Sequence, residues 1–162
     1  MTQYHPKSTE SLPPRISVLT GAVFYLIKIY THDHKALFGT IANGQRDLNA
    51  LGQIAADEWD RSSCAYRGIE LDEWVVLPDH LEGIVGIQEF SSSKGYATQG
   101  SKPRLLSAFI AGYKAAAAKR INLLRNAPGG SVWQRNYQER LIPDKAALGR
   151  ARQMLLRTSV EG

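Results

Sequence analysis

Two residues with metal-binding chemistry stand one residue apart in a strand-like run. His80 and Glu82 follow a Pro78-Asp79 break and flank the apolar Leu81. On an extended chain residues i and i+2 share a face, and their Cα atoms lie about 6.6 Å apart at a rise of roughly 3.3 Å per residue. An imidazole and a carboxylate at this spacing can converge on one divalent cation. We therefore expect a metal-type pair on one face of a strand whose other face enters a core.

A second histidine pair has the same spacing. His32 and His34 lie in a polar segment that follows the apolar run 22–31. They could bind a metal in principle, but turn histidines without further ligands nearby are usually solvated. The sequence favours the solvated turn and leaves the metal pair open.

The composition is that of a globular protein with one domain. The chain has 162 residues, of which 43% are apolar and 22% charged. No run approaches 18 consecutive apolar residues, so we expect no membrane span. The lone Cys64 cannot form an internal disulfide, which fits a reducing, cytoplasmic setting. We expect a flexible segment over residues 1–15 and a single domain over residues 16–162.

The charge is divided unevenly along the chain. Residues 1–101 carry 8 Lys/Arg and 12 Asp/Glu, whereas residues 102–162 carry 12 Lys/Arg and 3 Asp/Glu. The net charges are therefore −4 and +9. The basic third also holds Tyr113, Trp133 and Tyr137, and charge with interleaved aromatic rings suits a nucleic-acid surface. A solvated basic face is the alternative.

Hydrophobic periodicity predicts a series of strands and helices. The strands are expected at 22–31, 37–41, 71–77, 80–87 and 132–142, and the helices at 50–62, 101–125 and 145–157. Asn49 and Ser101 are expected to cap the first two helices, and residues 90–101 to form a loop. This order favours an α+β fold, a ferredoxin-like antiparallel sheet flanked by helices.

Four separated motifs resemble one protein family. They are Thr31-His32-Asp33, Leu48-Asn49-Ala50-Leu51-Gly52, Glu70 to Val85, and Val132-Trp133-Gln134-Arg135-Asn136-Tyr137. Together they resemble the REP-associated tyrosine transposases, single-tyrosine members of the HUH transposase superfamily. The resemblance covers residues 15–157.

The resemblance implies a specific chemistry. Members act on single-stranded DNA beside a hairpin, and a His-hydrophobic-His motif holds Mg²⁺ or Mn²⁺ against the scissile phosphate. A tyrosine on the C-terminal helix attacks and forms a 5′-phosphotyrosine intermediate. A polar residue one helical turn later completes the metal shell.

The sequence departs from this pattern at the residues that carry the chemistry. His80 matches the first histidine, and Glu82 replaces the second. A carboxylate is still a good ligand for Mg²⁺ or Mn²⁺. Met154 occupies the place of the nucleophile, where a thioether cannot attack phosphate, and we expect it to pack in the core. Thr158, one turn later, stands where the last metal ligand would be.

The remaining candidates each have two interpretations. Tyr137 is the best candidate for a substitute nucleophile, and its alternative is a structural or DNA-contacting role. The candidate DNA-binding residues are Lys114, Lys119, Arg120, Trp133 and Arg135. They could equally be a solvated helix face and a tryptophan that packs on the core.

Three functions fit the sequence. The first is a catalytically impaired, transposase-derived protein that binds single-stranded or hairpin DNA. The second is an active metal-dependent endonuclease and strand-transferase that uses His80, Glu82 and a substitute tyrosine such as Tyr137. The third is a folded remnant that has no ligand. Both a monomer and a homodimer fit the resemblance.

Overall fold

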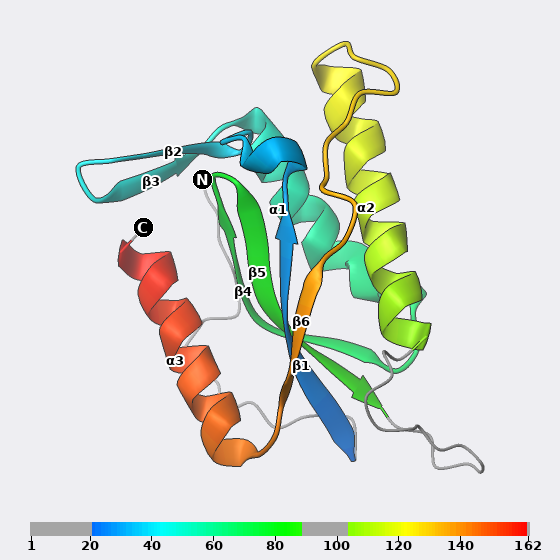
Figure 1. The fold of residues 1–162 in the computed structure, drawn as a ribbon, viewed down its shortest axis with the longest axis vertical. Helices are drawn as coiled ribbons and strands as arrows, with labels where there is room; N and C mark the ends of the chain where they lie inside the picture. The colour runs from blue at the N-terminus through cyan, green and yellow to red at the C-terminus, as the bar shows by residue number, and fades with distance from the viewer. Residues whose placement is uncertain (1–20, 89–103, 162) are drawn as a thin grey trace.

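The computed structural model describes residues 21–88 and 104–161 (Figure 1). Its strands are β1 Ala22–Tyr30, β2 Gly39–Ala42, β3 Gln45–Leu48, β4 Ile69–Leu77, β5 His80–Gln88 and β6 Gln138–Ile142. Its helices are α1 Ala50–Ser62, α2 Arg104–Leu124 and α3 Lys145–Glu161, with 3-10 turns at His32–His34 and Ser63–Ala65. The predictions for residues 1–15, for the loop 90–101 and for the Ser101 cap lie outside the described residues.

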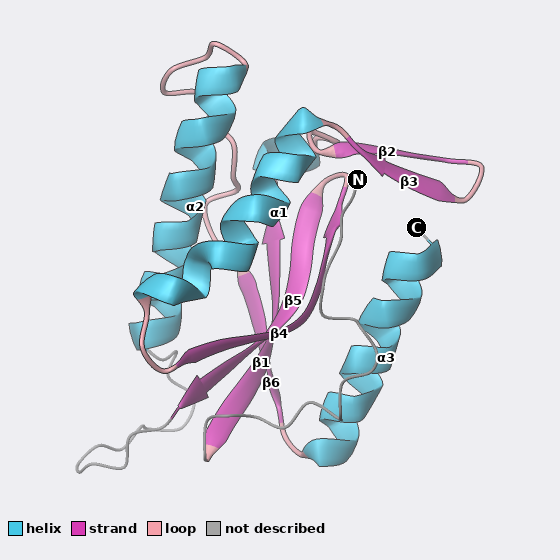
Figure 2. Cartoon of the chain, turned by 180° about the vertical axis from the view of Figure 1, so that it is seen from behind, coloured by secondary structure: helices cyan, strands magenta, loops and turns pink. Residues whose placement is uncertain are grey.

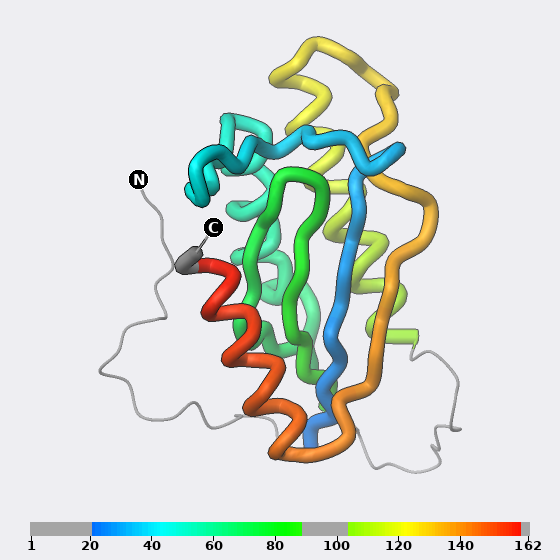
Figure 3. The backbone as a smooth tube through the Cα atoms, turned by 60° about the vertical axis from the view of Figure 1, so that its left-hand side comes forward, coloured from blue at the N-terminus to red at the C-terminus, as the bar shows by residue number. Residues whose placement is uncertain are grey.

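Four strands form one antiparallel sheet in the order β4-β5-β1-β6. The tube in Figure 3 shows these strands side by side, with α3 in front of β4 and β5. In the β1–β5 register, Tyr30 is paired with His80 and Lys28 with Glu82. Since Cα partners in an antiparallel pair project to the same side, this register decides which β1 residues surround the candidate metal pair.

Helices cover both faces of the sheet, which confirms the expected α+β fold. Figure 2 shows α1 and α2 together on one face, above the larger core. The side chains of Leu81, Val85 and Ile87 enter that core, as the strand alternation predicts. Ile84 faces the other way and packs with Leu148 and Leu155 of α3 in a smaller cluster. His80 and Glu82 have the same parity as Ile84, so they lie on the face of α3.

Helix α1 begins where the sequence predicts. The Asn49 side chain accepts a hydrogen bond from the Gly52 amide at 2.9 Å, which satisfies one of the orphan donors of the first turn. Trp59 lies fully buried on the apolar side of this helix, in edge contact with Tyr113 of α2. The two helices are thereby fixed against each other and against the sheet.

The segment after β1 differs from the expectation. A short strand was expected at 37–41 as a return strand, but β2 pairs with β3 in a separate two-stranded sheet. Asn43 and Gly44 connect them with positive φ angles of 56° and 73°. This conformation belongs to a two-residue hairpin turn, so the Asn-Gly pair connects β2 to a second strand, β3, that was not expected from the sequence.

The expected strand 132–142 is only half correct. Strand β6 begins at Gln138, and residues 132–137 join the sheet through a single bridge between Thr31 and Trp133. Trp133 turns its indole toward α2 and donates to the Lys114 carbonyl at 3.1 Å. The segment follows the end of β1 without forming a regular ladder because its side chains anchor it to a helix. Among the described helices, none is long and apolar enough to cross a membrane.

Candidate functional site

His80 and Glu82 lie together on the α3 face, at the start of β5. Nε2 of His80 lies 3.5 Å from Oε1 of Glu82, and their side chains are 15% and 12% exposed. Nδ1 of His80 lies 2.8 Å from Oδ1 of Asp79. The pair is therefore formed as the spacing predicts, and the neighbouring aspartate orients the imidazole.

A lysine from the adjacent strand completes this polar group. Nζ of Lys28 lies 4.0 Å from Oε2 of Glu82, which follows from their pairing in the register. Burial acts most strongly on His80 and would lower its pKa, but the hydrogen bonds to Glu82 and Asp79 together outweigh it. The pKa of His80 is consequently raised above its ordinary value.

The donor set fits part of a divalent metal shell. Adjacent ligands of an octahedral Mg²⁺ or Mn²⁺ ion, about 2.1 Å from the metal and about 90° apart, lie about 3.0 Å from each other. Nε2 and Oε1, which are 3.5 Å apart, would have to approach by about 0.5 Å to share such an ion. A hydrogen bond from Nδ1 to Asp79 would leave the Nε2 lone pair for a metal. The described part of the chain contains no group of three His, Cys, Asp or Glu that could hold a metal. His80 and Glu82 are therefore a candidate pair of ligands and not a complete set.

Tyr30 is the tyrosine that the fold brings to His80, and sequence reasoning missed it. Its ring stacks on His80 with centroids 4.7 Å apart, and it also stacks on His34 at 4.4 Å. The three side chains form a column of rings, His34–Tyr30–His80. Only the β1–β5 register identifies this neighbour, and no local pattern at residue 30 could have shown it.

Met154, the residue at which the sequence resemblance places a nucleophile, lies on the exposed part of α3. Met154 is 43% exposed, so the expectation that it packs in the core is wrong. Leu148 and Leu155 are buried against the sheet instead, with Ala151 partly buried beside them, and Met154 lies beside that stripe. The Thr158 hydroxyl donates to the Met154 carbonyl at 2.9 Å, so its hydrogen bond is made within α3.

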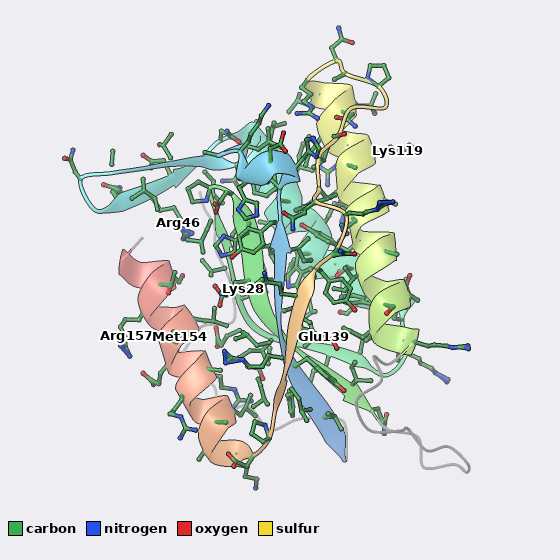
Figure 4. The ribbon with its side chains drawn as sticks, viewed as in Figure 1. Lys28, Arg46, Lys119, Glu139, Met154 and Arg157 are labelled. Carbon is green, nitrogen blue, oxygen red and sulfur yellow. The ribbon has the colours of Figure 1, made fainter. Side chains whose placement is uncertain are left out.

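Figure 4 shows where the labelled side chains of this region lie. Lys28 lies on the sheet, Met154 on α3 and Arg46 on the β2–β3 hairpin, whereas Arg157 projects from α3 away from the sheet. Arg46 donates to the Val76 carbonyl at 2.8 Å, and its pKa is lowered by burial. The hairpin is thereby fixed to β4 above the candidate pair.

Tyr137 lies on the other face of the sheet. Its hydroxyl is 3.5 Å from Oγ of Ser107 on α2, and its ring packs against the larger core. Burial raises the pKa of its phenol. The fold therefore does not bring Tyr137 to His80 and Glu82.

Two of the candidate DNA-binding residues make contacts within the fold. The Trp133 ring lies 5.5 Å from Phe38 and 5.6 Å from Tyr113, measured between centroids. Nζ of Lys114 donates to the carbonyls of Gln134 at 2.8 Å and Arg135 at 3.2 Å, and burial lowers the pKa of this lysine. Both side chains hold the 132–135 segment against α2.

The other three candidates differ in their surroundings. Arg120 lies 2.7 Å from Asp57 and 2.8 Å from Glu58 of α1, so its charge is neutralised by the protein. Lys119 is exposed on α2 (Figure 4), and Arg135 is exposed beside Trp133. Within residues 21–88 and 104–161, neither Lys119 nor Arg135 makes an ion pair or a side-chain hydrogen bond.

The two turn histidines are held by different partners. Nε2 of His34 lies 2.9 Å from Oε1 of Gln134, whereas Nε2 of His32 lies 3.5 Å from Oδ2 of Asp33. The two imidazoles therefore do not form a metal pair in this arrangement.

The fold places the protein in a known structural class. It resembles the solved structure of a REP-associated tyrosine transposase bound to a REP hairpin, with a TM-score of 0.51 and 13% identity. The match covers 92% of this chain and 73% of that one, so the two proteins share a transposase-type fold. No family model matches the sequence.

A relative in sequence defines the family. An uncharacterized protein of Haemophilus influenzae is 30% identical over 131 residues, which cover 75% of this chain and 72% of the relative. The chain belongs to the same family as that protein.

Proposed function

We propose that this protein is a transposase-derived DNA-binding protein that binds single-stranded or hairpin DNA without cleaving it. The observation that carries the loss of cleavage is the residue at the nucleophile position. Met154 lies there, exposed on α3, and a thioether has no proton to lose and forms no stable phosphoester. Tyr137, the substitute expected from the sequence, lies on the opposite face.

Two observations support the DNA ligand. The transposase with the same fold is bound to a hairpin. The C-terminal third of this chain carries a net charge of +9, which provides the electrostatic attraction that a phosphate backbone requires.

His80 and Glu82 are the residues that would hold Mg²⁺ or Mn²⁺ on this protein. When bound, the ion would supply a positive charge to a phosphate oxygen of the DNA. Asp79 orients the imidazole, and Lys28 balances the Glu82 carboxylate. With two protein ligands only, we expect weak metal binding.

An active endonuclease and strand-transferase is the second candidate, because one specific contact favours it. The Tyr30 ring stacks directly on His80, so a substitute phenol is present on the correct face. Tyr30 is thus a better candidate than Tyr137 for the attacking residue.

One experiment separates these functions. The protein is incubated with end-labelled hairpin DNA carrying a single-stranded flank and with Mn²⁺, then analysed on native and denaturing gels. We expect a salt-sensitive complex and no labelled protein after denaturation. A covalent band would support the enzyme, and its loss in Tyr30→Phe or Tyr137→Phe would identify the nucleophile. Absence of binding at low salt would favour the remnant without a ligand.

A further inference from the structure

The turn after β1 holds an aromatic ring in an unusual backbone conformation. Asp33 and His34 have φ angles of 58° and 53°, in the left-handed region that residues other than glycine adopt infrequently. Two such residues in succession are maintained only where the surrounding structure fixes them. Their effect is to place the His34 ring flat on Tyr30, with an interplanar angle of 6°.

The His34 ring is fixed on one face and along one edge. Tyr30 covers one face at a centroid distance of 4.4 Å, and Gln134 holds the ring edge through the contact to Nε2 at 2.9 Å. Gln134 is itself anchored, since its amide donates to the Tyr30 carbonyl at 2.9 Å. His34 is nevertheless exposed, and no ring of the described residues stacks on its second face.

Two exposed cations are sequence neighbours of the ring and of the residue that holds it. Lys35 follows His34 directly, and Arg135 follows Gln134. Both are exposed, and among the described residues neither side chain forms an ion pair or a hydrogen bond. A fixed ring with an open face, together with exposed cations at the next positions of the two segments that meet there, has the parts of a single-strand binding site, in which bases stack on rings and cations contact phosphates.

We propose that the open face of His34 is a stacking site for a nucleobase of single-stranded DNA, with Lys35 and Arg135 contacting the adjoining phosphates. This inference rests on the proposed DNA-binding function and assigns part of the ligand to a particular surface. The column His34–Tyr30–His80 then connects the stacked base with the candidate metal pair. If the ring only packed the turn, its removal would affect stability and leave DNA affinity unchanged.

The test uses variants of the full chain and a 5′-fluorescein-labelled (dT)12 probe followed by anisotropy at low salt. His34→Gly removes the ring and suits the positive φ, so the turn should remain folded. His34→Phe keeps a stacking ring and loses the nitrogen atoms. His32→Ala is the matched control, because it removes an exposed histidine of the same turn that stacks on no ring. Thermal unfolding of each variant reports on the fold.

We expect His34→Gly to weaken binding by about 5- to 30-fold, and His34→Phe to stay within about threefold of the native protein. His32→Ala should change the affinity by less than about twofold. In a second measurement, a 2-aminopurine placed in the oligonucleotide should be quenched on binding to the native protein and recover its emission with His34→Gly. That measurement does not depend on how well the Phe variant folds.

The experiment distinguishes failure of the stacking site from failure of the proposed DNA-binding function. Native binding with an unchanged affinity in His34→Gly would overturn the stacking site and leave the proposed function standing. Equal losses in His34→Gly and His34→Phe, in folded proteins, would also overturn it, because they would indicate a role for the nitrogen atoms. No binding of (dT)12 or hairpin DNA by the native protein would overturn both proposals.

Discussion

At the scale of single residues, Glu82 changes the nature of the site around His80. Its side chain is only 12% exposed, and a buried carboxylate requires a partner. Lys28 and the imidazole of His80 both provide one. This arrangement balances the charge of the carboxylate with groups of the protein itself.

The raised pKa of His80 predicts a pH dependence. Because the folded pKa lies above that of the unfolded chain, about 6.5, protonation of His80 stabilises the fold. This contribution is complete below the unfolded pKa and is lost as the pH rises through the folded pKa. Glu82→Gln removes the hydrogen bond that raises the pKa most. We therefore expect a lower His80 pKa and a smaller stability change between pH 6 and 8, by about 1 kcal/mol or less.

The measurement is an NMR titration of His80, combined with urea unfolding at both pH values. A His80 pKa that is the same in Glu82→Gln and in the native protein would contradict the assignment. The outcome would then point to Asp79, 2.8 Å from Nδ1, as the dominant partner.

At the scale of elements, two helical glycines predict effects of opposite sign. A Cβ at Gly149 of α3 would meet nothing within 4 Å, whereas one at Gly52 of α1 would press against the Phe38 carbonyl oxygen and the Leu48 side chain. Gly149→Ala should stabilise the protein by about 0.5–1 kcal/mol through helix propensity. Gly52→Ala should destabilise it by about 2 kcal/mol through overpacking against backbone. Urea denaturation measures both, and the same sign for both would contradict the close packing of α1 against Phe38 and Leu48.

An ion pair fixes α3 to the sheet. Arg152 contacts the Asp72 carboxylate through two hydrogen bonds, at 2.9 Å and 2.7 Å, and the Asp72 side chain is 1% exposed. Asp72→Asn leaves the arginine without a counter-charge, so we expect a loss of about 2–3 kcal/mol in the free energy of unfolding. The exposed pair Arg61–Asp57 is the control, and Arg61→Ala should cost about 0.5 kcal/mol or less. Equal losses in the two variants would show that α3 does not depend on this contact.

Elements with strong local signals could be predicted from the sequence. The β4–β5 hairpin is set by alternating apolar residues around Pro78-Asp79, and α1 by the Asn49 cap. The failures occurred where tertiary contacts decide. Asn43-Gly44 forms the turn of a hairpin, and Arg46 of that hairpin donates to a carbonyl of β4. Trp133 leaves the strand pattern because its side chain packs on α2.

At the scale of the whole molecule, only the part of the candidate site that lies on the single strand β5 could be predicted from the sequence. The pairing of His80 with Glu82 depends on local geometry and was predictable. Lys28 and Tyr30 join them through a register that pairs residues 50 or more positions apart in sequence. Tyr137 is excluded from them because it faces α2. The proposed loss of the nucleophile, by contrast, rests on the residue type at Met154 alone and needs no tertiary structure.

The distribution of charge predicts the salt dependence of DNA binding. Residues 102–162 carry 12 Lys/Arg, but several of these side chains already form hydrogen bonds or ion pairs within the protein. Lys114 donates to two carbonyls, and Arg120 and Arg152 form ion pairs with acidic side chains. Of the charges that remain, we expect about three to six to contact the phosphates of a single strand, and each should contribute about −0.7 to the slope of log K against log salt concentration.

We expect a slope between about −2 and −4 for (dT)12, measured by anisotropy from 50 to 300 mM salt. Arg135→Ala should reduce its magnitude by about 0.7, because this exposed side chain is free to contact a phosphate. Arg120→Ala removes the same formal charge and should leave the slope nearly unchanged, because Asp57 and Glu58 already neutralise it. Equal reductions in both variants would mean that DNA responds to the net charge of the basic third and not to particular residues. A slope near zero would show that the basic third is a solvated surface.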